Sequence, residues 1–537
     1  MRSSGKSVLI LWTVLIFSLT VGPRPAMAAD DLEFKGMSYA GWWSGVYAAP
    51  GSDLSLSHLA ETGADWVSLI VTVYQDDLHS TSIARNEATP IDAELIQAIN
   101  RAHGLGLKVL LKPHLDLWAD PAHWRGEIGT VFETEAEWDV WFGSYRNIID
   151  QFADLAKAQG ADMFCVGTEL LGTTSRVAEW REVIAGVRAR FPGPLIYASN
   201  HSGEETGLTW WDAVDFIGVD AYYPLAAGSG PSLDELKSSW AAHRDTLAGL
   251  AARWQKRVVL TEIGYRSIDG TASHPWDWQV QGTVDLEEQA VAYQAVQETF
   301  DGLSWFAGLF WWSWGTDPYE GGPCDDGFSP HDKPAEAVVR TWYGARFAWR
   351  PEPALEPDDS RTLDIYKDGL GPGWEDLSWG AEVNLSDTGR ACRGSSSIRA
   401  RLEPWGALSF GHAPVKAWPH YRLLEFCLYV PAADPPQLSV FFYDQDGKEL
   451  SRRRVNDCRY LEGGQVRTDA WNHVSIPLRH LAVGDHSLSR ICFEDSSGQG
   501  CSDFGLDAVR LVGASLVTSP PKAKKDDTDI GDPDKRR

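Results

Sequence analysis

Two short stretches of this chain share one pattern, in which an apolar run ends in Thr-Glu and a turn follows. The stretches are Phe164–Leu171 and Val258–Tyr265, and they place Glu169 and Glu262 93 residues apart. Each pattern is typical of a buried strand that presents an acid at its carboxyl end. In a (β/α)₈ barrel these strand ends meet at one mouth, where the catalytic side chains of such enzymes lie. The repetition therefore predicts two carboxylates that converge over a barrel axis.

The segment from Glu33 to about Phe347 alternates strand and helix patterns, which predicts an α/β domain with a parallel sheet. Eight strands are predicted: Phe34–Tyr39, Trp66–Val73, Leu107–Lys112, Met163–Thr168, Leu195–Ser199, Phe216–Val219, Val258–Thr261 and Ala307–Trp312. The helical patterns between them include Ala93–His103, Glu135–Gln159, Val177–Arg190, Leu233–Trp254 and Leu286–Phe300. This alternation favours a (β/α)₈ (TIM) barrel over residues 29–349. A doubly wound open sheet is the alternative, but no Gly-rich phosphate loop follows the first strand.

The beginning of the chain predicts export. Residues 1–28 have a positive start, an apolar run from Ser7 to Val21 and a small-x-small site at Ala26-Met27-Ala28, which together are typical of a signal peptide. The apolar run is short for a membrane span, although an uncleaved anchor is the alternative interpretation. We therefore expect a secreted or periplasmic protein with no membrane span after signal cleavage.

The last third of the chain has a different pattern. Residues 350–361 are rich in Pro and acids and are predicted to form a linker. Residues 362–515 lack helical patterns, and short alternating runs predict an all-β jelly-roll sandwich. The strand patterns there are Ser397–Leu402, Tyr421–Val430, Leu438–Tyr443, Trp471–Ile476 and Leu506–Leu511. The charged residues 516–537 are predicted to form a disordered tail.

The amino-acid composition disfavours nucleic acid as a partner and is compatible with binding to sugars. The chain has 48 Lys+Arg against 75 Asp+Glu, and a formal charge of −27 argues against binding to nucleic acid. Its 26 Trp are about three times average usage, and flat aromatic faces stack on sugar rings.

Seven Cys permit disulfides in an exported chain, with Cys165 expected in the core and one or two bridges in the last third. There is no zinc signature, and no Gly-x-Ser-x-Gly elbow follows a strand, which disfavours a Ser-based hydrolase. Catalysis by two carboxylates needs no cofactor.

Two carboxylates at strand ends suit glycoside hydrolysis. A retaining glycosidase holds its two carboxyl groups ~5–5.5 Å apart, so that one attacks the anomeric carbon and the other protonates the leaving oxygen. Their environments must keep the acid protonated and the nucleophile ionised. Taken singly, Glu169 or Glu262 is as readily a cap or a salt-bridge partner, but the matched pair favours catalysis.

Five segments in this order resemble glycoside hydrolase family 113: Lys112–Asp116, Val166–Leu170, Gly218–Pro224, Thr261–Tyr265 and Phe310–Trp314. The resemblance spans roughly residues 34 to 345 and does not cover the C-terminal third. That family belongs to clan A of the retaining hydrolases, and its characterised members are β-mannanases on a (β/α)₈ barrel. The resemblance implies that Glu169 is the general acid/base and that Glu262 is the nucleophile. It implies an endo-β-1,4-mannanase acting on a β-linked polysaccharide or oligosaccharide.

One position departs from the wider clan. Most clan A enzymes have Asn immediately before the acid/base, where it hydrogen-bonds the sugar 2-hydroxyl, whereas this chain has Thr168. Asn200, at the end of the fifth strand, is the candidate replacement amide. Tyr222 and Tyr223 on the sixth strand are both candidates to donate to the nucleophile, and we expect one of them to serve packing alone.

Further residues are predicted to contact the sugar. His114 and Asp116 alternate to the same side of the third strand, although the pair would equally brace the barrel. Trp312 and Trp314 share a face and are candidates for the floor of the central subsite. Trp42, just after the first strand, is a candidate for the lining of a more distant subsite. Trp residues at the lip of a barrel are structural at least as often.

The C-terminal segment resembles the jelly-roll sandwiches that are often appended to glycan-degrading enzymes. This resemblance implies a domain that binds carbohydrate and a structural calcium, for which Asp368 and Asp507 are the candidate ligands. Trp374, Trp379 and Trp405 are candidates for a sugar-stacking platform. The alternative is that these Trp fill the core and the domain supports the barrel.

Other functions remain open at this point. Another β-1,4-glycanase, a glucanase or a xylanase, would use the same two acids. A non-catalytic glycan-binding envelope protein that kept the barrel is the alternative from a different class. The sequence leaves the oligomeric state open.

Overall fold

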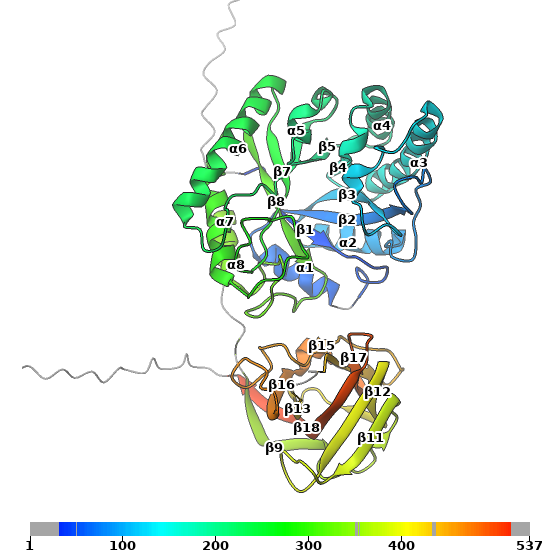
Figure 1. Cartoon of the computed structure of the whole chain (residues 1–537), viewed down its shortest axis with the longest axis vertical. Helices are drawn as coiled ribbons and strands as arrows, with labels where there is room; N and C mark the ends of the chain where they lie inside the picture. Colours follow the sequence, from blue (N-terminus) through cyan, green and yellow to red (C-terminus); the bar gives the residue numbers. More distant parts are fainter. Residues whose placement is uncertain (1–31, 50, 349–352, 354, 432–435, 517–537) are drawn as a thin grey trace, which may run out of the picture.

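The computed structural model describes residues 32–49, 51–348, 353, 355–431 and 436–516, which form a helix-covered barrel and a smaller β domain (Figure 1). The predicted signal peptide over residues 1–28 lies outside the described residues. The predicted tail over residues 516–537 also lies outside them, apart from residue 516. Of the helices in the described part of the chain, none is long and apolar enough to cross a membrane.

Eight parallel strands close into a barrel in chain order, which confirms the predicted (β/α)₈ fold. They are β1 (Phe34–Ala40), β2 (Trp66–Gln75), β3 (Lys108–Leu117), β4 (Met163–Thr168), β5 (Leu195–Asn200), β6 (Phe216–Asp220), β7 (Val258–Ile263) and β8 (Phe306–Gly315). The helices outside them are α1 (Ser52–Glu61), α2 (Asp92–Gly104), α3 (Glu135–Gln159), α4 (Val177–Arg190), α5 (Glu204–Gly207), α6 (Leu233–Trp254), α7 (Leu286–Phe300) and α8 (Pro334–Tyr343).

Local sequence fixes where the two longest helices begin. Thr134 caps α3 by accepting from the N–H of Glu137, whose carboxylate in turn accepts from the N–H of Thr134. Ser232 and Glu235 form the same reciprocal pair at the start of α6. Each pair satisfies donors that the first turn of a helix leaves free, so both helices start at defined residues.

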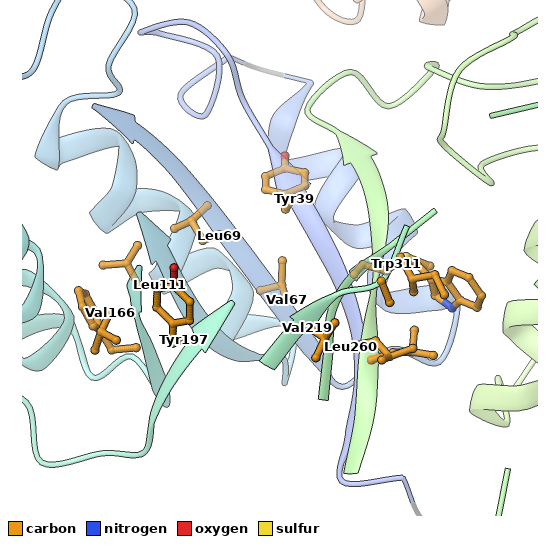
Figure 2. Packing of buried hydrophobic residues seen from close by; sticks show 14 of the residues in the cluster. Tyr39, Val67, Leu69, Leu111, Val166, Tyr197, Val219, Leu260 and Trp311 are labelled. Carbon is orange, nitrogen blue, oxygen red and sulfur yellow. The ribbon is translucent and has the colours of Figure 1, made fainter. Parts of the chain in front are cut away.

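Alternation along the strands separates two apolar cores. One set of strand side chains points outward and packs under the helices, and Figure 2 shows members from every strand: Tyr39, Val67, Leu69, Leu111, Val166, Tyr197, Val219, Leu260 and Trp311. A smaller set fills the barrel interior and includes Leu110, Met163, Ile196 and Phe310. Because the interior is packed with side chains, chemistry is confined to the carboxyl ends of the strands.

The C-terminal domain is an antiparallel β structure, as predicted. Its strands are β9 (Leu355–Tyr366), β10 (Glu375–Asp376), β11 (Trp379–Asp387), β12 (Ser397–Lys416), β13 (Leu423–Val430), β14 (Leu438–Asp444), β15 (Arg453–Arg454), β16 (Ala470–Pro477), β17 (Ser487–Asp495) and β18 (Cys501–Leu516). The first part of β12 pairs with β11 and β18, and its last part pairs with β10 and β17. This long strand therefore joins the two groups of strands that enclose the domain's apolar core.

The linker predicted over residues 350–361 is shorter than expected. Residues 355–361 belong to β9, which pairs with β18 from Leu355 to Tyr366. Pro357 is tolerated because β9 lies at a sheet edge, where one row of N–H groups needs no partner. The Pro- and acid-rich composition that predicted a linker also suits an exposed edge strand.

Two disulfides form among the described cysteines. Cys392–Cys427 lies within the β domain, with its Cα atoms 6.3 Å apart. Cys324–Cys458 joins the barrel to the β domain, with a Cα separation of 5.9 Å. Cys165 forms no disulfide and is buried in the barrel, as predicted, and Cys492 is likewise buried without a disulfide. Cys501 is buried in the β domain. The sequence predicted bridges in the last third, and one of the two instead crosses between domains.

Candidate active site

Glu169 and Glu262 both lie at the carboxyl end of the barrel. Glu262 is in β7 and is buried, with 4% of its surface exposed. Glu169 directly follows β4, is half-buried, and its N–H donates to the carbonyl of Ala198 at 2.8 Å. Its φ of 53° lies in the left-handed region, which is uncommon for a residue with a side chain and is often found at functional sites. The structure thus holds both predicted carboxylates at the mouth.

Glu262 is surrounded by donors. Lys112 Nζ lies 2.5 Å from Oε1, and the Tyr222 hydroxyl donates to Oε2 at 2.9 Å. His114 Nε2 lies 3.4 Å from Oε1, a contact longer than a good hydrogen bond. Burial opposes the charge on Glu262, but the Lys112 ammonium and the His114 contact hold its pKa well below the usual value. Glu262 is therefore ionised near neutral pH.

A buried ion cluster lies beneath Glu262. Lys112 comes from β3 and Asp220 from the end of β6, and both side chains are fully buried. Lys112 Nζ lies 3.2 and 3.4 Å from the two oxygens of Asp220, and Thr261 donates to Asp220 at 2.7 Å. Burial opposes the charge on Lys112, but Asp220 and Glu262 raise its pKa, whereas burial and Glu262 raise the pKa of Asp220. The Lys112 cation thus stabilises the charged form of Glu262.

Arg125 sets the orientation of His114. It lies in the short 3₁₀ helix η1 (Arg125–Glu127) after β3 and donates to His114 Nδ1 at 2.8 Å. A second nitrogen of Arg125 donates to Asp116 at 2.8 Å. Because Nδ1 accepts a hydrogen bond, the neutral ring carries its proton on Nε2, which faces Glu262. Burial, aided by the charge of Arg125, lowers the pKa of His114 to about 4, so the ring stays neutral near pH 7.

The environment of Glu169 favours its protonated form, in contrast to that of Glu262. Its Oε1 accepts a hydrogen bond from the Asn200 amide at 2.7 Å, which places Asn200 on the predicted acid/base itself. Burial and the nearby charge of Glu262 raise the pKa of Glu169 above its usual value. Two carboxyl groups whose environments push their pKa values apart are the arrangement that assigns an acid and a base in an enzyme.

Aromatic side chains flank the carboxylates on the β1–β3 side. The Trp312 ring stacks on His114 with centroids 6.1 Å apart, and Trp42, which is 45% exposed, lies 5.8 Å from Trp312. Trp314 does not join them, because it is only 2% exposed and its indole N–H donates to Ser55. Met37 pairs with Trp311 and Tyr39 with Trp314, so β8 has one extra residue there. This bulge breaks the alternation that placed Trp312 and Trp314 on one face.

The two adjacent tyrosines after β6 have different partners. Tyr222 donates to Glu262, whereas Tyr223 turns to the helix layer, donates to Glu205 at 3.3 Å and stacks on His243. Beside Tyr222, His201 lies 6.4 Å from the Tyr222 ring and 5.4 Å from Trp276. Trp276 is 43% exposed and provides a second aromatic face near the carboxylates.

The acids predicted to bind calcium in the β domain already have donors. Asp507 Oδ2 accepts from the N–H groups of Cys392 and Arg393, and Asp368 Oδ1 accepts from those of Ser395 and Ser396. Neither acid belongs to a group of three metal-ligating side chains within the described residues. These contacts suit two loop braces better than an oxygen shell for Ca²⁺, and the ion stays a prediction.

The predicted platform of three Trp is divided. Trp374 is 8% exposed and packs on His412. Trp379 and Trp405 are exposed neighbours, and the indole N–H of Trp379 donates to the carbonyl of Trp405. The structure therefore leaves only these two of the three available at the surface.

Four residues of the site were not predicted from the sequence as site residues: Lys112, Asp220, Arg125 and Trp276. Lys112 lies two residues before His114, so strand alternation was sufficient to place it on the same inward face. Asp220 ends β6 in the same way that Glu262 lies near the end of β7, and the two pair in register. Arg125 lies in a one-turn 3₁₀ helix and Trp276 in a loop, and neither segment has a periodicity that predicts the direction of a side chain.

A (β/α)₈ barrel whose mouth holds one carboxyl group with a lowered pKa and one with a raised pKa, flanked by aromatic rings, is typical of glycoside hydrolases. Residues 37–333 match the sequence profile of Glycoside Hydrolase Family 113, and the chain belongs to this family. Structural neighbours include a GH113 β-1,4-mannanase in a complex, at 30% identity and a TM-score of 0.53 over 58% of this chain and 99% of that chain.

A second neighbour is the GH113 β-mannanase AaManA from Alicyclobacillus acidocaldarius in complex with ManMIm. It is 33% identical, with a TM-score of 0.53 over 59% of this chain and 99% of that chain. Both neighbours thus match along nearly their whole length within little more than half of this chain. No curated protein matched the sequence.

Proposed function

We propose that this protein is an endo-acting, retaining β-1,4-mannanase in which Glu262 is the nucleophile and Glu169 is the general acid/base. The observation that carries the proposal is the opposite environment of the two carboxyl groups. Glu262 faces the Lys112 cation, whereas Glu169 is half-buried near the negative charge of Glu262 and keeps its proton more readily. The matched β-mannanases support the substrate class.

In the first half of the reaction, Glu262 attacks the anomeric carbon as the bond to the leaving oxygen breaks. Glu169 gives its proton to that oxygen, which leaves as a sugar hydroxyl. The Tyr222 hydroxyl and Lys112 hold the Glu262 carboxylate in a fixed position for the attack. The product is a glycosyl ester on Glu262 and an ionised Glu169.

In the second half, Glu169 acts as a base. It takes a proton from a water molecule, and the oxygen of that water attacks the anomeric carbon and releases Glu262. Ionisation of Glu169 is disfavoured next to a charged Glu262, but in the intermediate Glu262 is a neutral ester. The pKa of Glu169 therefore falls when it must act as a base and rises again when Glu262 is released.

The flanking groups suit a neutral polysaccharide. Trp42, Trp312 and Trp276 offer aromatic faces to sugar rings, while Asp116 and Arg125 offer hydrogen-bonding groups for hydroxyls. We extend the proposal to an exported enzyme, secreted or periplasmic, because two disulfides suit an oxidising compartment.

The test is release of reducing sugar from glucomannan, galactomannan, a cellulose derivative and xylan, by the protein from residue 29 onward. The matched control is Glu262→Gln, which removes the charge and keeps the shape. We expect release from the mannans only and none from the control. Proton NMR of the first product anomer then tests retention, which predicts initial formation of the β-anomer.

The outcomes separate the alternatives. Release from the cellulose derivative or from xylan would keep the two-carboxylate mechanism and overturn the mannan specificity. An α-anomer as first product would overturn the covalent intermediate. Binding to a polymer without release, by a folded protein, would favour the non-catalytic glycan-binding protein.

A further inference from the structure

The loop between β7 and α7, residues 264–285, begins directly after the strand of the predicted nucleophile. It carries Trp276, whose ring lies against His201. His201 follows Asn200, the donor to Glu169, and also contacts the ring of Tyr222, the donor to Glu262. The position of this loop therefore determines where one exposed aromatic face lies relative to both carboxylates.

The β7–α7 loop is held from outside by the loop between β8 and α8, residues 316–333. Ser267 accepts a hydrogen bond from the buried Lys333 at 2.8 Å and donates to the carbonyl of Asp325 at 2.6 Å. Arg266 binds the carboxylate of Asp326 at 2.9 Å and the carbonyl of the same residue at 3.1 Å. Lys333 also binds the Asp325 carboxylate, at 2.6 Å. The β7–α7 loop is thus anchored by the β8–α8 loop.

The β8–α8 loop is in turn fixed to the β domain. Cys324, next to Asp325, forms the disulfide with Cys458. Arg453 of β15, at the end of the β domain nearest the barrel in Figure 1, binds Asp317 with a nitrogen–oxygen distance of 2.8 Å. Arg459 donates to the carbonyl of Tyr319 at 2.9 Å. A covalent bond, an ion pair and a main-chain hydrogen bond thus converge on one loop.

We infer that the β domain is a positioning element for the sugar site, and that it acts through the β8–α8 loop to hold Trp276 of the β7–α7 loop beside the carboxylates. The contacts form an unbroken series from Cys458 through Cys324, Asp325 and Ser267 to the loop that carries Trp276. The matched GH113 structures correspond to the barrel part of this chain, so the brace is an addition of this chain to them. The sugar-binding part of the inference rests on the proposed function, whereas the mechanical part does not.

The mechanical part is tested by hydrogen–deuterium exchange on the full chain. The variant Cys324→Ser/Cys458→Ser cuts the bridge between domains, and Cys392→Ser/Cys427→Ser cuts the bridge inside the β domain as the matched control. We expect at least a threefold faster exchange within residues 264–285 in the first variant and no change there in the control. Asp317→Asn, which weakens the ion pair and leaves both bridges in place, is expected to give a smaller change in the same residues.

The sugar-binding part is tested by steady-state kinetics. Cutting Cys324–Cys458 is expected to raise KM for glucomannan about three- to tenfold with kcat within twofold, because it moves a binding face and leaves the carboxylates in place. Trp276→Ala is expected to give a similar rise in KM. Combining the two changes is expected to add little, because both remove the same contact.

Each outcome decides a separate claim. Unchanged exchange in residues 264–285 after the bridge is cut would overturn the inference, whatever the enzyme hydrolyses. Faster exchange with unchanged KM would overturn the link to sugar binding, as would fully additive effects of the two changes. If wild-type protein hydrolyses no mannan, the proposed function fails, and exchange still decides whether the β domain braces the loop.

Discussion

The barrel mouth and the β domain bury carboxylates in different ways. At the mouth, Glu262 and Asp220 share one side-chain cation, and Glu169 is held by a side-chain amide. In the β domain, Asp507 is fully buried, yet its oxygens accept from the backbone N–H groups of Cys392, Arg393 and Ala508. Asp495, also buried, accepts from the N–H groups of Ser497 and Gly500.

The difference separates a reactive site from a structural one. Backbone donors are fixed and neutral, so a carboxylate whose oxygens they satisfy has little capacity left for a ligand. At the mouth, the partners of the carboxyl groups are a side-chain cation, an amide and other acids. The protonation states of these groups depend on one another, so a proton or a covalent bond gained at one carboxyl group changes the pKa of its neighbour. We expect substitution of these carboxylates to affect mainly catalysis at the mouth and mainly folding in the β domain.

The largest effect is expected for Glu262→Gln. An amide of the same shape cannot attack the anomeric carbon, so kcat on glucomannan should fall by roughly 10⁴-fold or more. The melting temperature should fall modestly, because Lys112 loses one of its two partner carboxylates. In Glu262→Ala, where the shortened side chain leaves room, azide as a small external nucleophile should restore part of the rate on an activated aryl mannoside. Activity within tenfold of wild type would remove Glu262 from the mechanism.

The next largest effect is expected for Glu169→Gln, with a rate loss of about 10²- to 10⁴-fold on the polymer. The pH profile gives the sharper test. In wild type, kcat/KM should fall as pH rises through the raised pKa of Glu169, because the leaving oxygen then has no proton donor. The variant should lose this alkaline limb, and a substrate whose leaving group needs no proton should restore its first step. An alkaline limb that survives the substitution would assign it to another group.

The sequence was sufficient for the barrel and for the pair of carboxylates, because both depend on strand periodicity. Apolar runs with an acid at the end locate Glu169 and Glu262 without any knowledge of contacts. Alternation failed at β8, where one extra residue moved Trp314 from the mouth into the wall against α1. At β9 it was composition that misled, because an exposed edge strand has the same Pro- and acid-rich composition as a linker.

The partners of the carboxylates were not predictable in the same way. The contact between Lys112 and Glu262 spans 150 residues, and Arg125 reaches His114 from a loop. The link from Cys324 to Cys458 depends on how two domains face each other, which no local pattern records. Contacts of this kind require the tertiary structure, whereas the face of a strand on which a residue lies does not.

An intermediate effect is expected for Lys112→Met. Lys112 holds the pKa of Glu262 low, so its loss should raise that pKa and move the acidic limb of kcat/KM to higher pH. The enzyme should therefore lose activity first at low pH and keep more of it near neutrality. The free energy of unfolding should fall by about 3–5 kcal/mol, because buried acids lose their cation.

Asp220→Asn is the matched control for this change. It removes the competing carboxylate and leaves Lys112 with Glu262 alone, so the acidic limb should stay in place or move to lower pH. A shift of the limb in the same direction in both variants would indicate a general disturbance of the barrel. It would contradict a specific role of the Lys112 charge.

A smaller effect on the reaction is expected for Trp312→Ala. Trp312 is half-buried against His114 and faces the mouth, so its loss should raise KM for glucomannan about ten- to hundredfold, in line with one stacking face. Trp314→Phe is the matched comparison. Trp314 is buried and bonded to Ser55, so this change should lower the melting temperature and leave KM within twofold. A larger rise in KM for Trp314→Phe than for Trp312→Ala would return Trp314 to the sugar site.

The smallest effect on the reaction is expected for Asp507→Asn in the β domain. Replacing one carboxylate oxygen with an amide nitrogen sets N–H against N–H at one end of the side chain, either at Ala508 or at Cys392 and Arg393, so the free energy of unfolding should fall by about 1–3 kcal/mol. The kcat on a short mannooligosaccharide should stay within twofold of wild type. Thermal unfolding with EDTA and with added Ca²⁺ completes the test. A structural brace predicts the same melting temperature in both, whereas stabilisation by Ca²⁺ that the substitution abolishes would establish the calcium site and make this carboxylate a metal ligand.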